Sequence, residues 1–334
     1  MKAEYRPPCS KERKPLQDLL PLDTPLTIYI DPSNICNFSC KFCFHGNKDK
    51  LEEMPAKKMM RIELFKKIVN DLKEFPSTVK MIHLHGFGEP LLNKNLAEMI
   101  KLLKNSNVVE RVAITTNAST FTDENMKAII EAGLDQIHIS IYGLSQEQYM
   151  EFSHNKCNYL KLIENIKKLY DIKGSCHIHI KITGDYFSDE KKNLFLNTFG
   201  DYSDTIFVDN AANIWPGLDI TDTLGDGQKL KHQYGQNIVE DKVCPNLFYQ
   251  LLIHSDGFVS PCCADYRKKI KIGDVNKESL MIIWNNSLLN TMRINHLKRN
   301  VKNYAACTDC EYPFVASTVN INPYINSLLE KYEQ

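Results

Sequence analysis

The sequence predicts an α/β protein with a partial (β/α)6 TIM-like barrel and a small cysteine-rich C-terminal domain. Three observations predict this class. The chain has 334 residues, enough for one barrel of about 250 residues and an appendage. Short β-rich runs alternate with helical patterns over residues 26–210, which is typical of βαβ units in a parallel sheet. Five of the eleven cysteines lie in the last hundred residues.

The barrel elements follow one another in regular order. The six expected strands cover residues 26–31, 79–86, 111–117, 135–143, 176–182 and 205–210. Between the first two, Ile62, Phe65 and Ile68 recur with helical spacing. A later helix is expected to begin after Thr122, a good N-cap residue, and to end at Gly133. Since a complete barrel has eight βα units, we expect six to form an open or partial one.

The amino-acid composition changes after Asn210, and this change sets the expected domain limits. Residues 1–25 are an N-terminal extension, 26–215 the barrel, 216–240 a Gly- and Asp-rich linker, and 241–334 a separate, smaller domain. Within that domain we expect a hairpin with its turn at Asp256-Gly257 and one amphipathic helix near 280–297.

Polar residues alternate with isoleucines in the middle strands of the barrel. The isoleucines should face the covering helices, which leaves the polar set facing the barrel interior. A barrel interior that only packs is filled with Val, Ile and Leu, so this interior is expected to hold a ligand, although any one histidine could instead be an ordinary core residue. The set is Tyr29, Asp31, His83, His85, His138, Ser140, Tyr142, His177, His179 and Lys181.

Charge and hydropathy exclude several classes of partner. The 41 basic and 41 acidic residues balance, so no electrostatic footprint for nucleic acid stands out. No apolar run of about 18 residues and no signal peptide is visible, so we expect a cytoplasmic protein without membrane contact. A small polar molecule is the expected substrate. In a reducing compartment, clustered cysteines more often bind metal or perform chemistry than form disulfides.

Three cysteines lie close together just after the first strand, at Cys36, Cys40 and Cys43. Three thiolates can hold three corners of a four-iron cluster and leave the fourth iron open for a ligand. The alternative is a structural zinc with His45 as the fourth ligand.

This CxxxCxxC spacing, with the aromatic Phe42 before the last cysteine, resembles the signature of the radical S-adenosylmethionine (SAM) superfamily. Three further elements carry the same resemblance. Residues 86–90, GFGEP, resemble the glycine-glutamate element whose backbone and carboxylate hold the SAM amino group. Residues 115–117 end the third strand with a Thr-Asn pair, and residues 132–143 resemble the fourth strand of the family. The resemblance implies cofactor-binding roles for Phe42, Gly86, Gly88, Glu89, Asn117 and Ser140. Lys181, which strand parity directs to the same interior, is also expected to bind the cofactor.

The resemblance also implies a reaction. The open iron of the 4Fe-4S cluster binds SAM, and a reducing electron splits SAM into methionine and a 5′-deoxyadenosyl radical that takes a hydrogen atom from the substrate. The protein contributes placement and exclusion of water. An external electron donor such as flavodoxin or ferredoxin is then required.

The C-terminal cysteines resemble the SPASM and twitch extensions of radical SAM enzymes, which carry auxiliary 4Fe-4S clusters. The resemblance implies one auxiliary cluster here, and it leaves Cys263 without a ligand role. Residues 212–217, ANIWPG, resemble a segment that precedes this extension in many relatives. A zinc site with four cysteines is the alternative. The implied ligands are Cys244, Cys262, Cys307 and Cys310.

Departures from better-defined subfamilies narrow the expected substrate. The short N-terminal extension leaves no room for a peptide-recognition domain, and no cobalamin domain is visible. What remains resembles the enzymes with one auxiliary cluster that act on carbohydrate-like metabolites, so a substrate of that kind is expected. If the substrate radical loses an electron to the auxiliary cluster, the reaction is a dehydrogenation. If a thiol returns a hydrogen atom to the opposite face, it is an epimerisation, and Cys263 is the proposed donor; buried packing is its other possible role.

Two further hypotheses stay open. One is a radical SAM maturase that modifies a peptide recognised through a separate partner. The other is a non-enzymatic scaffold that binds zinc at both cysteine sets. Cys9, Cys157 and Cys176 have no motif partners and receive no role. The substrate, the physiological donor and the oligomeric state do not follow from the sequence.

Overall fold

The computed structural model describes residues 1–8, 13–48, 56–184, 187–220, 231–239 and 243–333. Its strands form one sheet of ten among these residues, in the order β1-β7-β6-β5-β4-β3-β2-β8-β9-β10. The strands are β1 (Glu4–Tyr5), β2 (Thr27–Ile30), β3 (Val79–His83), β4 (Val109–Thr116), β5 (Gln136–Ile141), β6 (His177–Thr183), β7 (Thr205–Asp209), β8 (Gln250–Ile253), β9 (Phe258–Ser260) and β10 (Gly273–Asp274).

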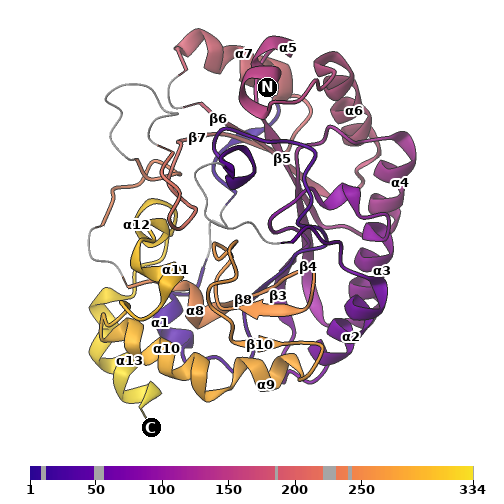
Figure 1. The fold of residues 1–334 in the computed structure, drawn as a ribbon. Coiled ribbons are helices and arrows are strands. Elements are labelled where there is room, and N and C mark those ends of the chain that lie inside the picture. Colours follow the sequence, from indigo (N-terminus) through magenta and orange to yellow (C-terminus); the bar gives the residue numbers. More distant parts are fainter. Residues whose placement is uncertain (9–12, 49–55, 185–186, 221–230, 240–242, 334) are drawn as a thin grey trace.

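Helices cover the outer face of the barrel strands, and a second group of helices lies near the C-terminus of the chain (Figure 1). They are α1 (Leu16–Leu19), α2 (Ile62–Leu72), α3 (Leu96–Ser106), α4 (Asp123–Glu131), α5 (Gln146–Ser153), α6 (Tyr159–Ile172), α7 (Asp189–Phe199), α8 (Asn246–Tyr249), α9 (Leu280–Trp284), α10 (Ser287–Leu297), α11 (Ala305–Thr308), α12 (Tyr312–Val315) and α13 (Ile325–Tyr332).

The six predicted barrel strands are β2 to β7, and each pairs in parallel with its neighbour in chain order. The partial barrel is confirmed. Its isoleucines are buried toward the helices, as Ile137, Ile139 and Ile141 in β5 illustrate. The helix expected after Thr122 begins there as α4, and Thr122 and Asn125 form a reciprocal capping box. Gly133 follows that helix with φ of +89°, where a side chain would be strained.

The hairpin turn expected at Asp256-Gly257 is also confirmed, but the hairpin does not form a sheet of its own. Strand β8 pairs in parallel with β2 of the barrel, and β9 returns antiparallel to β8. The C-terminal segment therefore shares the sheet of the barrel at this point. Because β8 is buried at every residue, its apolar side chains are best covered when the strand continues the barrel sheet.

Two other expectations need correction. The single helix expected near 280–297 is two helices, α9 and α10. The break occurs at Asn285 and Asn286, and the side chain of Asn286 accepts a hydrogen bond from the backbone N–H of Leu289 at 2.8 Å, capping α10. The N-terminal extension also contributes β1, which pairs with β7 at the far end of the sheet.

Candidate functional site: two cysteine sets and the barrel interior between them

The three-cysteine loop leaves β2 at its carboxyl end, the edge where barrel enzymes build their active sites. The backbone closes tightly here, because the N–H of Cys43 donates to the Cys40 carbonyl at 3.0 Å. Burial raises the pKa of Cys36 to about 11 and that of Cys43 to about 12, and it raises the pKa of Cys40 well above its ordinary value. The thiols must lose protons to bind iron, so cluster binding at this loop releases protons.

His45, the fourth ligand of the zinc alternative, already has a partner. Its Nε2 lies 2.6 Å from the carbonyl oxygen of Phe87. Burial lowers the pKa of this imidazole, so it is neutral at pH 7. The donor set that faces a metal from this loop is therefore three thiols, as an open four-iron site requires.

The glycine-glutamate element packs directly against the cysteine loop. A Cβ at Gly88 would collide with the backbone carbonyl of Ser33, and one at Gly86 would meet the Asp31 side chain at 2.8 Å. Asp31 in turn accepts a hydrogen bond from the N–H of Phe87 at 3.1 Å. Glycine at both positions is thus required by close approach of the backbone.

Glu89 is a buried carboxylate, 2% exposed, at the centre of the predicted SAM site. It accepts hydrogen bonds from Thr116 Oγ1 at 2.6 Å, the Asn117 N–H at 2.8 Å and the Leu91 N–H at 3.1 Å. Burial nevertheless raises its pKa to about 7, against the lowering effect of these donors. A cationic amino group beside it would return the carboxylate to its charged form.

The other predicted cofactor residues occupy the same end of the barrel or the layer next to it. The Asn117 side chain donates to Asn37 Oδ1 at 3.0 Å, which ties β4 to the cysteine loop. Trp215 Nε1 donates to the Phe42 carbonyl at 3.1 Å. Ser140 is paired with Lys181 across β5 and β6. Lys181 is committed to an ion pair with Asp209 at 2.6 Å, and the sequence reasoning had missed Asp209.

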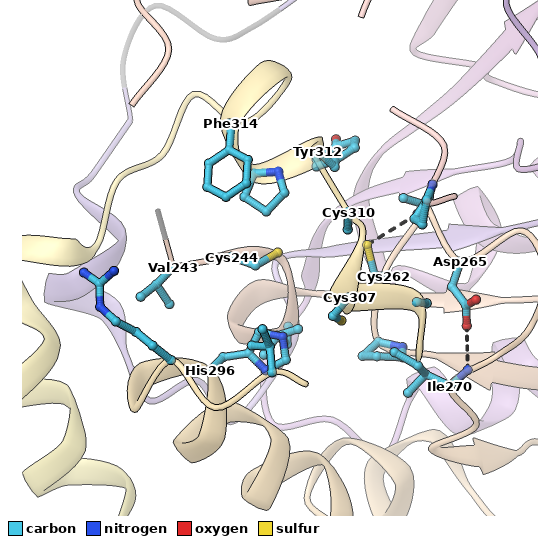
Figure 2. A pocket seen from close by; sticks show the side chains of 18 residues that line it. Val243, Cys244, Cys262, Asp265, Ile270, His296, Cys307, Cys310, Tyr312 and Phe314 are labelled. Atoms are coloured by element: carbon cyan, nitrogen blue, oxygen red, sulfur yellow. Dashed lines mark hydrogen bonds between the residues drawn. The ribbon is translucent and has the colours of Figure 1, made fainter. Parts of the chain in front are cut away.

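The second cysteine set surrounds a cavity of ≈ 150 Å³ (Figure 2). Its lining includes all four predicted auxiliary ligands: Cys244, Cys262, Cys307 and Cys310. A cavity of about this volume holds a ligand the size of benzene. Cys262 Sγ accepts weak hydrogen bonds from Asn246 Nδ2 at 3.5 Å and the Ala264 N–H at 3.4 Å. Such bonds stabilise a ligating thiolate and tune a cluster's potential.

Within the described part of the chain, no three His, Cys, Asp or Glu side chains are arranged to hold a single metal ion. A four-iron cluster is larger than one ion and separates its thiolates further. The cavity and its all-thiol donor set therefore fit a cluster of this kind at the C-terminal site.

Cys263 is absent from the lining of this cavity and has a different environment. Its thiol donates to Tyr312 Oη at 3.9 Å. Burial raises the pKa of Tyr29, on barrel strand β2, and the nearby Cys263 adds to that effect. Cys263 therefore lies at the edge of the cavity, beside Tyr312 of its lining, and also close enough to Tyr29 to affect that barrel residue. Tyr312 was not predicted, since it is 49 residues away in the sequence.

Two of the remaining cysteines lie in the apolar core of the barrel. Cys157 and Cys176 are buried among apolar side chains of the barrel, and Cys9 lies outside the described residues. No helix within the described ranges is long and apolar enough to cross a membrane.

A partial barrel with an open three-cysteine loop, joined to a closed four-cysteine cavity, defines a class of iron-sulfur enzymes that bind a ligand at one cluster. Sequence comparison agrees. The profile of the radical SAM superfamily matches residues 30–193, and that of the SPASM iron-sulfur cluster-binding domain matches residues 244–311. The chain belongs to the radical SAM superfamily and carries a C-terminal SPASM domain.

Individual relatives have low sequence identity to this chain, but each match extends over most of it. The chain is 26% identical to the tungsten-containing aldehyde ferredoxin oxidoreductase cofactor-modifying protein of Pyrococcus furiosus, over 85% of this chain and 86% of that protein. Its fold resembles BtrN in complex with AdoMet and 2-DOIA, with a TM-score of 0.55 at 16% identity over 85% and 92% of the two chains. It also resembles Streptococcus suis SuiB bound to the precursor peptide SuiA, with a TM-score of 0.60 at 15% identity over 93% and 74%.

Family membership confirms three predictions: the fold class, SAM with its 4Fe-4S cluster, and iron-sulfur binding by the C-terminal domain. The zinc-scaffold hypothesis has no support from these findings. The role of each named site residue stays a prediction.

Proposed function

We propose that this radical SAM enzyme epimerises a small polar, carbohydrate-like substrate, with Cys263 as the hydrogen-atom donor and one auxiliary cluster at Cys244, Cys262, Cys307 and Cys310. One observation carries the proposal: Cys263 does not line the cavity that its neighbour Cys262 lines, and it is close enough to Tyr29 of the barrel to raise the pKa of that tyrosine. A thiol not needed as a cluster ligand is then available to the barrel interior.

The topology supports an approach to the substrate from opposite sides by the SAM elements and by Cys263. The SAM elements, including Gly86 and Glu89, follow the carboxyl ends of the strands. Cys263 lies three residues after β9, which runs antiparallel to β8 and ends opposite Leu252, and its thiol is within hydrogen-bonding reach of the Gln250 side chain. Gln250 is the first residue of β8 and pairs with Thr27, the first residue of β2. The thiol therefore approaches from the amino end of these strands, opposite the SAM elements.

The proposed reaction removes one hydrogen atom from a substrate carbon and returns one to the same carbon. When bound, the SAM cluster and SAM supply the 5′-deoxyadenosyl radical that removes one hydrogen atom from a substrate carbon. Cys263 returns a hydrogen atom to the opposite face of that carbon through its S–H bond, which inverts the centre and leaves a sulfur radical on Cys263. One electron from the external reductant and one proton restore the thiol. Tyr312, at 3.9 Å from Sγ, orients the thiol.

The test uses a panel of aminocyclitols, aminosugars and nucleotide sugars with the cluster-loaded enzyme in deuterated water. The thiol proton exchanges with solvent, so the inverted product should carry one deuterium at the new centre. Cys263→Ala should still form 5′-deoxyadenosine and give no inverted product, whereas Cys157→Ser, a buried cysteine elsewhere, should behave as the wild type. A ketone product, or inversion by Cys263→Ala, would refute the proposal.

Peptide modification is a second candidate function. It is favoured by the fold similarity to SuiB bound to its precursor peptide, which extends over 93% of this chain. Adding candidate precursor peptides to the same panel distinguishes the two functions, because only a peptide substrate would then stimulate 5′-deoxyadenosine formation.

A further inference from the structure

The barrel interior contains a layer of histidines where packing residues are expected. The register aligns Thr115 of β4 with His138, His138 with His179, and His179 with Thr205. His85, just after β3, joins this level because its Nε2 lies 3.4 Å from Thr115 Oγ1. Barrel layers are usually filled by Val, Ile and Leu. Imidazoles in their place need an explanation beyond packing.

These rings contact one another and Tyr29. His83 stacks on Tyr29 with ring centroids 4.7 Å apart, and it meets His85 edge to face at 5.0 Å. His138 and His179 meet edge to face at 5.4 Å. These contacts hold the rings in place, and the ring nitrogens are the polar groups that they offer a ligand.

Several of these edges end in buried nitrogen atoms without a hydrogen-bond partner. They are His83 Nδ1, His85 Nδ1 and His179 Nε2. His179 is 1% exposed, and its other nitrogen, Nδ1, is held by Thr205 Oγ1 at 2.8 Å. Buried polar atoms are nearly always paired in folded proteins. Three unpaired atoms in one small region are hydrogen-bonding positions that the protein itself leaves unused.

The region carries no net charge. Burial lowers the pKa of His85 and His138 to about 3 and that of His179 to about 2, so these rings are neutral at pH 7. One layer further toward the SAM elements, Lys181 and Asp209 neutralise each other. Asp209 is 1% exposed, and its Oδ1 is also buried without a partner. The unpaired atoms therefore require hydrogen-bond partners and not a counter-ion.

We propose that His83, His85, His138 and His179 form a subsite that binds the hydroxyl groups of a polyhydroxylated ring, a cyclitol or a sugar, on the side away from its reacting carbon. A hydroxyl both donates and accepts, so it pairs with a neutral imidazole nitrogen in either tautomer. This inference rests on the proposed function and names the substrate class of the same site. A flat heterocycle has fewer hydroxyl groups to offer these nitrogens.

The experiment measures equilibrium binding by calorimetry, anaerobically, on protein loaded with both clusters and SAM but without reductant. The probes are myo-inositol, glucosamine, neopterin and a Gly-Ser peptide. We expect myo-inositol or glucosamine to bind. His179→Phe, which fills the space but has no nitrogen edge, should weaken that binding at least tenfold, and His179→Gln should retain part of it.

The control is His154→Asn. His154 is exposed at the end of α5 with φ of +50°, a conformation that asparagine tolerates. Iron content and circular dichroism establish that each variant is folded, and His138→Gln replaces any variant that is not. Failure of both polyols to bind, unchanged binding by His179→Phe, or binding of neopterin or the peptide alone would overturn the subsite. Polyol binding followed by ketone formation would instead overturn only the epimerase.

Discussion

Replacing Glu89 by glutamine tests the SAM site most directly. In the wild type, Oε1 accepts from Thr116 and Leu91, and Oε2 accepts from the Asn117 N–H. A glutamine can keep its oxygen toward Thr116 and Leu91, but its NH2 group then faces the Asn117 N–H, so two donors oppose each other. The variant also lacks the charge that would hold the SAM ammonium.

The expected loss of SAM affinity follows from the loss of one hydrogen bond to a charged group. A hydrogen bond to a charged group is worth about 1.5–3 kcal/mol, and each 1.4 kcal/mol is about tenfold in affinity. Glu89→Gln should therefore weaken SAM binding by about 10- to 150-fold, measured by calorimetry on cluster-loaded protein at pH 8. Glu147→Gln, on the exposed start of α5, is the matched control and should bind SAM as the wild type does.

The same residue predicts a pH dependence. Burial raises the pKa of Glu89 to about 7, so the carboxylate becomes protonated as the pH falls through 7. Its charged form is the one that attracts an ammonium, so this residue should weaken SAM binding about tenfold between pH 8 and pH 6. Without SAM the sign reverses for folding, because protonation relieves a buried charge and stabilises the folded state as the pH falls. Affinity within twofold of the wild type, or an unchanged pH slope in Glu89→Gln, would refute this account.

Three further predictions concern the clusters and the barrel. Cys244→Ala should lower the iron content from about eight to about four atoms per chain by removing one of two four-iron clusters; unchanged iron would contradict the ligand assignment. Gly88→Ala should abolish SAM binding, because its Cβ would collide with a carbonyl of the cysteine loop; retained affinity would show that the loop can yield. Lys181→Met should lower the free energy of unfolding by about 3 kcal/mol, at the low end for a broken buried pair, because Asp209 is left alone; the exposed Lys161→Met should change it by less than about 1 kcal/mol.

The barrel was predictable because its signals are local. Each strand carries its own two-residue alternation, as in β5, and α4 carries its own cap and stop at Thr122 and Gly133. The three-cysteine loop and the glycine-glutamate element are likewise short motifs. Their residues meet because the carboxyl ends of parallel strands share one edge of the sheet.

The rest depends on contacts between distant residues, which no local pattern encodes. The pairing of β8 with β2 joins segments more than 200 residues apart. The partners of Lys181 and Cys263, namely Asp209 and Tyr312, are 28 and 49 residues away. The break between α9 and α10 was a local signal that we missed, because Asn285-Asn286 is a poor helix interior and asparagine is a strong N-cap.

The pairing of β8 with β2 connects these observations. Because β8 runs parallel to the barrel and β9 returns antiparallel to it, the chain comes back toward the amino ends of the strands before it reaches Cys262 and Cys263. The SAM elements stay at the carboxyl ends, and the histidine layer lies along the strands between the two. A substrate bound to that layer would have the SAM elements toward one face and the Cys263 thiol toward the other. Inversion would use the Cys263 thiol on the second face, whereas dehydrogenation would pass an electron to the auxiliary cluster, so only the proposed epimerisation predicts a chemical role for Cys263.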